Sequence, residues 1–80
     1  MFKLNLIYST NKNIFKDFGG TKDLTTFDFY KNAKSLQLTD PDGRAFVIHP
    51  KDIQHREQTV VVTTKNSIYV FEIICWKKVS

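Results

Sequence analysis

The sequence predicts a mainly β protein that folds as a small antiparallel sheet, strongly bent or closed into a barrel, of five to six strands. Short apolar runs rich in β-branched and aromatic residues alternate with turn residues, and neither a strand–helix–strand spacing nor a repeat is present. One short helix fits near residues 21–33. A chain of 80 residues makes a single β-rich domain, 1–80, with little room for a deep active site.

The clearest pattern begins at Leu36. Leu36 and Leu38 alternate with polar residues, which is typical of a half-buried strand. Residues 40–43 read DPDG and predict a turn, because proline presets the first central position and Gly43 can adopt a positive φ. We expect residues 44–48 to return as the partner strand of a hairpin.

Beyond this hairpin the pattern changes at Pro50, which has no N–H to donate and ends the strand. Residues 49–53 are predicted to form a single helical turn with Ile53 packed into the core. Residues 60–62 are all valine, and such a β-branched run indicates an interior strand with apolar residues on both sides. Lys65-Asn66 is predicted to be a two-residue hairpin connection.

Residues 68–76 form the longest predicted strand, and nearly every position is apolar. One row of alternate residues comprises Tyr69, Phe71, Ile73 and Cys75, and the other comprises Ile68, Val70, Ile74 and Trp76. Cys75 is therefore expected to be a buried, inert thiol. Both rows need cover, either from residues 21–33 or from another chain. Glu72 interrupts the second row, where it must find a partner or face water.

The N-terminal part is predicted to be a hairpin. Its first strand alternates, and the residues expected to point inward are Phe2, Leu4, Leu6 and Tyr8. Residues 9–13 suit a turn, and residues 14–18 suit a returning strand that ends at Gly19-Gly20. Residues 21–33 fit either a helix capped by Thr21 or a strand, and the β-forming residues at 25–30 favour the strand.

Charge and composition narrow the class of protein. The net charge is +4, and ten of the twelve basic residues are lysines. Lysine keeps surfaces soluble, whereas proteins that read nucleic acids usually use more arginine. The single cysteine cannot form an intramolecular disulfide, and no apolar run is long enough for a signal peptide or a membrane span. We expect a cytoplasmic protein that does not bind a membrane.

No residue pattern indicates catalysis, a metal site, a cofactor or a small-molecule substrate. His49 and His55 lack the spacing of metal ligands, and only one cysteine is present. Asp40 and Asp42 occupy positions that a turn favours, so they are not a pair of catalytic carboxylates. We therefore expect no enzyme activity, no cofactor, and no catalytic or metal-binding residue.

Residues 36–72 resemble the small flagellar FlbD-type proteins and similar short bacterial β proteins. The resembling pieces are LQLT at 36–39, DGRAFVI at 42–48, HPKDI at 49–53, TVVVT at 59–63 and YVFE at 69–72. Their order is strand, turn with glycine, strand, break with proline, and hairpin. The resemblance implies a β meander that acts through protein contacts, and it implies no catalytic residue.

These observations predict a non-enzymatic interaction module that binds a protein partner, or a second copy, through a strand edge or an apolar patch flanked by lysine. A regulator or inhibitor encoded by a phage or mobile element fits the size. The residues expected to bind the partner are Trp76, Ile74, Glu72, Ile68, Arg44, Lys51 and Arg56. The alternative is a single-stranded nucleic-acid or RNA-binding small barrel, because basic residues are interspersed with aromatic ones from Phe27 to Arg56.

Overall fold

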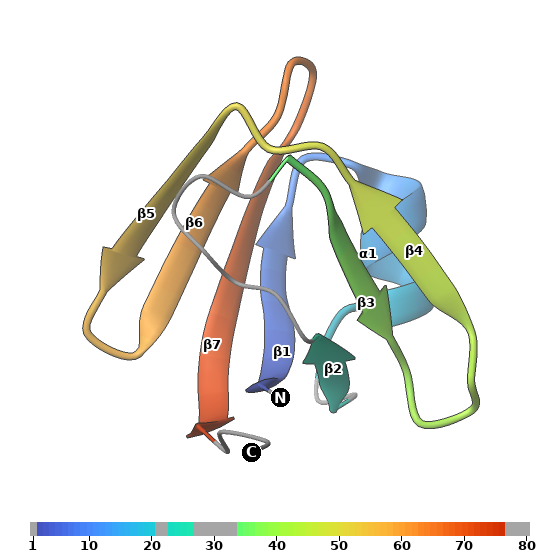
Figure 1. Cartoon of the computed structure of the whole chain (residues 1–80). Helices are drawn as coiled ribbons and strands as arrows, with labels where there is room; N and C mark the ends of the chain where they lie inside the picture. Colours follow the sequence, from blue (N-terminus) through green and yellow to red (C-terminus); the bar gives the residue numbers. More distant parts are fainter. Residues whose placement is uncertain (1, 21–22, 27–33, 77–80) are drawn as a thin grey trace.

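The computed structural model describes residues 2–20, 23–26 and 34–76, apart from the side chain of Trp76. They form a seven-stranded antiparallel sheet in the order β4-β3-β2-β1-β7-β6-β5. The elements are β1 (Phe2–Ser9), α1 (Lys12–Phe18), β2 (Leu24–Thr26), β3 (Leu36–Thr39), β4 (Ala45–Ile48), β5 (Asp52–Arg56), β6 (Thr59–Thr63) and β7 (Ile68–Trp76). The mainly β class is confirmed. The sheet is bent and open, with β4 and β5 at its two margins (Figure 1), and it has slightly more strands than predicted.

The first and last strands lie side by side at the centre of the sheet, from Phe2 opposite Trp76 to Ser9 opposite Tyr69. Alternate side chains of every strand point to one side, which we call the inner face, and there they form the core. The buried strand residues of this core are Leu4, Leu6, Leu24, Leu36, Leu38, Phe46, Ile48, Ile53, Val60, Val62, Tyr69, Phe71 and Ile73. The opposite side of the sheet is the outer face.

Residues 12–18 form a helix, so the strand predicted at 14–18 is wrong. The Asn11 side chain accepts a hydrogen bond from the N–H of Ile14 at 3.2 Å, which caps the first turn. Ile14 and Phe18 are four residues apart and lie on the same side of the helix. Phe18 is buried, and its ring centre lies 4.5 Å from that of Phe46. Helical spacing of these two residues therefore anchors α1 to the core.

α1 lies before residues 21–33, the segment in which the sequence also allows a short helix. Leu24–Thr26 is β2, so this part of the segment is extended, as the β-forming residues predicted. Residues 27–33 lie outside the described residues. β2 pairs with β3 through one residue pair, Thr25 opposite Thr39. The short β2 therefore links the central strands to the β3–β4 hairpin.

The β3–β4 hairpin confirms the turn predicted at residues 40–43. Gly43 has a φ of +87°, and its N–H donates to the Asp40 carbonyl at 3.0 Å. The Asp40 carboxylate accepts from the N–H groups of Asp42 and Arg44 at 3.0 and 2.8 Å and lies 3.3 Å from Arg44 Nε. Burial alone would raise the pKa of Asp40, but the hydrogen bonds from Arg44 and Asp42 and the Arg44 charge hold it below its usual range.

Residues 52–56 form β5, so the helical turn predicted at 49–53 is wrong. Pro50 does end β4, but the chain becomes extended again two residues later and pairs with β6 along the whole of β5. Ile53 is 1% exposed, and the prediction that it packs into the core is confirmed. A proline between two extended segments thus separates two strands of the sheet.

The β6–β7 hairpin follows the sequence pattern. β6 lies between β5 and β7, so the valine run is an interior strand, as predicted. The Thr64 N–H donates to the Ser67 carbonyl at 2.8 Å across the connection Lys65-Asn66. β7 is the longest strand, and it pairs with β1 on one side and β6 on the other. The strand with two apolar rows is therefore at the centre of the sheet.

Candidate protein-binding surface

The outer face carries apolar side chains over the central strands β1, β7 and β6. The exposed fractions are 44% for Ile7, 53% for Tyr8, 39% for Ile68 and 45% for Ile74. Single exposed apolar residues are ordinary on a protein surface, whereas a group of them on neighbouring strands marks a contact surface. We define the outer apolar patch as Ile7, Tyr8, Ile68 and the half-buried Val61 and Val70, while Ile74 lies further along β7, beyond Glu72.

Strand pairing places the patch in rows across the sheet. Tyr8, Val70 and Val61 lie opposite one another on β1, β7 and β6. Directly opposite side chains on antiparallel strands are roughly 5 Å apart, so this row is continuous. The next row toward the C-terminal end of β7 is polar and comprises Asn5, Glu72 and Thr59. The outer face therefore has an apolar row beside a polar one.

Two irregularities in the β1–β7 pairing add exposed apolar residues to the outer face. The register shifts between Leu6 and Tyr8 and again between Lys3 and Leu4, so each strand has one residue without an opposite partner, Ile7 and Ile74. An extra residue of this kind is a β-bulge, and it reverses the alternation beyond it. Tyr8 therefore turns outward, and the prediction that it points inward is wrong.

The same mechanism applies at the other end of the strand pair. Cys75 follows the extra residue Ile74 and lies opposite Lys3, whose side chain is exposed. Cys75 is exposed as well, so the prediction of a buried thiol is wrong. The alternation seen in the sequence predicted Cys75 to follow Tyr69, Phe71 and Ile73 into the core, and the bulge removes it from that row.

The polar row contains a buried amide oxygen that has no hydrogen-bond partner among the described residues. Asn5 lies opposite the exposed Glu72. Its Oδ1 atom is buried and accepts no hydrogen bond from the residues that the structure describes. Buried polar atoms are nearly always paired, and an unpaired one lowers stability. The outer face thus contains a polar group that does not stabilise the isolated sheet.

Three of the residues predicted to bind a partner come together on this face. Ile68, Glu72 and Ile74 lie along the outer side of β7. Trp76 ends β7 opposite Phe2, and its side chain lies outside the described residues. Sequence reasoning missed Tyr8 and Asn5, because a bulge has no signal in an alternating pattern and Asn5 looks like any solvent-facing strand residue.

Arg44, also among the predicted residues, contacts its own chain. Its Nε lies 3.3 Å from Asp40 Oδ2, and its guanidinium carbon lies 5.4 Å from the ring centre of Phe18. Nη2 donates to the Asp17 carbonyl at 3.4 Å. These contacts join the β3–β4 turn to the C-terminal end of α1. Arg44 thus has a structural role far from the outer apolar patch.

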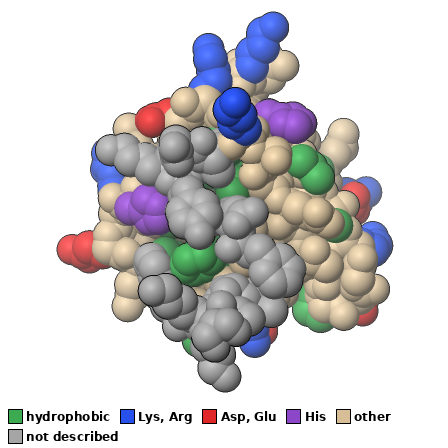
Figure 2. All heavy atoms as spheres, viewed as in Figure 1, with side chains coloured by type: hydrophobic (Ala, Val, Ile, Leu, Met, Phe, Trp, Pro, Cys, Tyr) green, Lys and Arg blue, Asp and Glu red, His purple; other side chains and the backbone are tan. Residues whose placement is uncertain are grey.

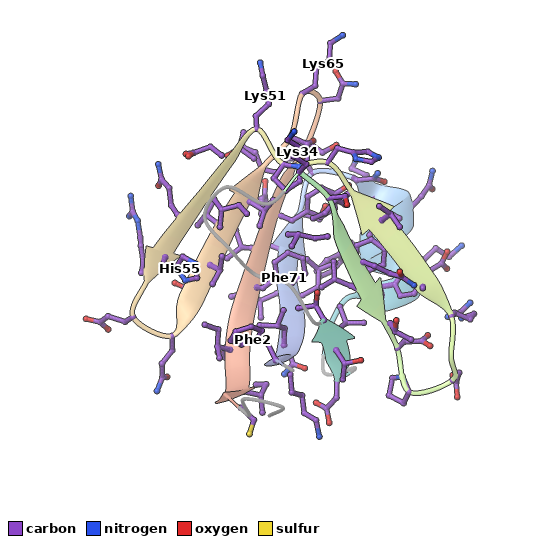
Figure 3. The ribbon with its side chains drawn as sticks, in the orientation of Figure 1. Phe2, Lys34, Lys51, His55, Lys65 and Phe71 are labelled. Carbon is purple, nitrogen blue, oxygen red and sulfur yellow. The ribbon has the colours of Figure 1, made fainter. Side chains whose placement is uncertain are left out.

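Lys51 and Arg56 lie at the two ends of β5. Figure 3 places Lys51 at one end of the sheet together with Lys34 and Lys65, and all three are exposed. They come from the segments before β3, between β4 and β5, and between β6 and β7. Figure 2 shows blue side chains projecting from this end. We call Lys34, Lys51 and Lys65 the lysine end of the molecule.

The described residues line shallow hollows along an edge strand and at a turn. One of about 440 Å³ follows β5 and is lined by Asp52, Ile53, Gln54, His55 and Arg56. Another of about 350 Å³ lies at the β6–β7 turn and is lined by Thr10, Thr63, Thr64, Lys65, Asn66, Ser67 and Ile68. Over residues 2–20, 23–26 and 34–76, no three His, Cys, Asp or Glu side chains gather as a metal site. No helix in this part of the chain is long and apolar enough to span a membrane.

The chain matches no protein-family model, and no curated protein or solved structure matches it. The resemblance of residues 36–72 to FlbD-type proteins therefore stays a prediction.

Proposed function

We propose that this chain is a non-enzymatic interaction module that binds a protein partner through the outer apolar patch. One observation carries the proposal: the row Tyr8–Val70–Val61 crosses the three central strands on the face away from the core, with Ile7 and Ile68 beside it. Interfaces place such aromatic and aliphatic groups at their centre and polar groups around them. The exposed Glu72, in the row Asn5–Glu72–Thr59, supplies a polar group beside it.

The shape of this surface supports a protein as the ligand. The patch lies on one side of a sheet and spans three strands, whereas small molecules are held in concave pockets that bury most of their surface. A protein partner covers roughly 800 Å² of one side of an interface, and a sheet face can supply such an area. A small regulator or inhibitor acting by such a contact needs no catalytic group, which fits the lack of catalytic motifs in the sequence.

The proposal is tested by placing a charge in the patch. Ile68→Lys introduces a charge on the outer face of β7, and Gln37→Lys, on the exposed side of β3, is the matched control. Tagged wild type and both variants are used to isolate partners from the cells that make the protein, with quantitative mass spectrometry. We expect wild type and Gln37→Lys to retain the same protein and Ile68→Lys to lose it. Equal retention by all three would contradict the proposal.

A second candidate function is the binding of single-stranded nucleic acid, and the lysine end favours it. Phosphates attract exposed lysines, and the affinity then falls with salt at a slope of about 0.7 per neutralised phosphate. Fluorescence anisotropy with a labelled single-stranded RNA measures this slope. Replacing Lys34, Lys51 and Lys65 by alanine is expected to lower it by about 2. No binding of wild type at low salt would exclude this function.

A further inference from the structure

The strand β4 forms one margin of the sheet, and its turn shows which of its backbone groups face outward. Asp40 N–H donates to the Arg44 carbonyl at 2.8 Å, and Gly43 N–H donates to the Asp40 carbonyl at 3.0 Å. This is a three-residue hairpin loop in which residues 40 and 44 form the first hydrogen-bonded pair. Hydrogen-bonded pairs of an antiparallel ladder occur at every second residue. The pairs 38–46 and 36–48 are therefore the next ones.

It follows that Ala45 and Val47 direct their N–H and C=O groups away from β3. β4 pairs with β3 alone, and neither residue has a hydrogen bond elsewhere in the described part of the chain. Both side chains are exposed, Val47 to 53%. β4 lies at a margin of the sheet (Figure 1). Along this margin it thus presents two donors and two acceptors in a row.

The opposite margin of the sheet differs in its side chains. β5 carries Asp52 and Arg56 at its two ends, and charged residues on an edge discourage pairing with another strand. The four residues of β4 are Ala, Phe, Val and Ile, without a charge. An uncharged, regular edge strand is a template for a further strand. The sheet is therefore protected at one margin and open at the other.

We propose that β4 pairs with β4 of a second copy of this chain, so that two sheets join into one. In an antiparallel pairing centred on Phe46, Ala45 lies opposite Val47 of the second copy, and Val47 lies opposite its Ala45. The outward donors and acceptors then form four hydrogen bonds about a two-fold axis. Arg44 lies opposite Ile48 of the second copy, so no like charges meet. This surface is separate from the outer apolar patch, and the dimer does not depend on that patch.

The hydrogen-bond pattern supplies a selective variant. Val47→Pro removes an N–H that β3 does not use, so the β3–β4 ladder stays intact, and edge strands accept proline at such positions. Val47→Lys adds a charge to the same edge, and Gln54→Lys makes the same change on β5 as the control. Circular dichroism and thermal melting verify that each variant is folded.

Sedimentation velocity over a wide concentration range is the test. Wild type and Gln54→Lys are expected to shift from monomer to dimer with rising concentration. Val47→Pro and Val47→Lys should raise the dissociation constant at least about tenfold, because each interface loses two donors or gains two like charges on one face of the joined sheet. In exchange measurements on wild type, the amides of Ala45 and Val47 should become protected as the dimer forms.

Two results overturn the proposal. Wild type that stays monomeric at all concentrations has no such interface. A dimer that Val47→Pro leaves intact and Ile68→Lys abolishes uses the outer face instead. If Ile68→Lys loses the external partner but still forms the dimer, the two surfaces are independent, and this result supports both proposals.

Discussion

The two faces of the β1–β7 pair are made by the same strands, but they bury their side chains differently. On the inner face, Leu4, Leu6 and Phe71 are fully buried. On the outer face, Tyr8 and Ile74 remain about half exposed. Two bulges cause part of this difference, because each adds an apolar residue outside and reverses the alternation beyond it. The comparison suggests a division of roles, in which the inner face stabilises the fold and the outer face is available to a partner.

The largest effect is expected on the inner face. Phe71→Ala should lower the free energy of unfolding by about 3–5 kcal/mol, because it leaves a cavity in a closely packed core. Its neighbour Val70 is half-buried on the outer face, so Val70→Ala should lower the free energy of unfolding by less than about 1.5 kcal/mol. Urea unfolding of both variants measures the difference. Equal losses would show that the two faces are packed alike.

A buried carboxylate on the β3–β4 turn provides the next prediction. The pKa of Asp40 is lower in the folded protein than its ordinary value of 3.8, so the unfolded state binds more protons between the two values. The stabilisation is present above the ordinary value and is lost as the pH falls through the folded-state pKa. Asp40→Asn should make the melting temperature fall less steeply as the pH drops below about 4. An unchanged pH profile in the variant would assign the effect to other carboxylates.

At Asn5, a substitution is expected to raise the stability of the fold by a small amount. Replacing Asn5 by valine removes the unpaired Oδ1 atom and introduces a residue that favours strands, so stability should rise by about 1 kcal/mol. Urea unfolding measures the stability. A loss of stability would show that Asn5 is well satisfied in the isolated protein.

The smallest effect on stability is expected in the patch itself. Ile68→Lys replaces an exposed side chain and should change the free energy of unfolding by less than about 0.5 kcal/mol. A loss of several kcal/mol would mean that Ile68 belongs to the core. Ile68 would then stabilise the fold, which contradicts its assignment to the outer apolar patch even if the variant also loses the partner.

Sequence patterns predicted much of the fold where local chemistry decides the conformation. The turn at residues 40–43 has a proline and a glycine that suit its backbone, and the rows of β7 set the core positions of Tyr69, Phe71 and Ile73. Sequence patterns were insufficient where the same residues fit both a strand and a helix. The cap at Asn11 and the four-residue spacing from Ile14 to Phe18 were signals of α1 that the β-forming residues around them obscured.

The candidate surface was only partly predictable from the sequence. Two apolar rows in β7 indicated that Ile68 and Ile74 need a partner or a covering layer, and they do lie on the outer face. Tyr8 could not be assigned to that face, because a bulge depends on the register of two strands that are distant in sequence. The open edge of β4 could not be predicted from the sequence either, because it depends on the strand order of the whole sheet.

The most direct test of the outer face is photo-crosslinking in living cells that make the protein. A photoreactive amino acid replaces Ile68 in one variant and Gln37, on the same face of β3, in the other. We predict that irradiation links the variant at position 68 to a distinct partner protein and leaves the variant at position 37 unlinked. No adduct at position 68, or the same adducts at both positions, would contradict the claim that the outer apolar patch is the binding surface.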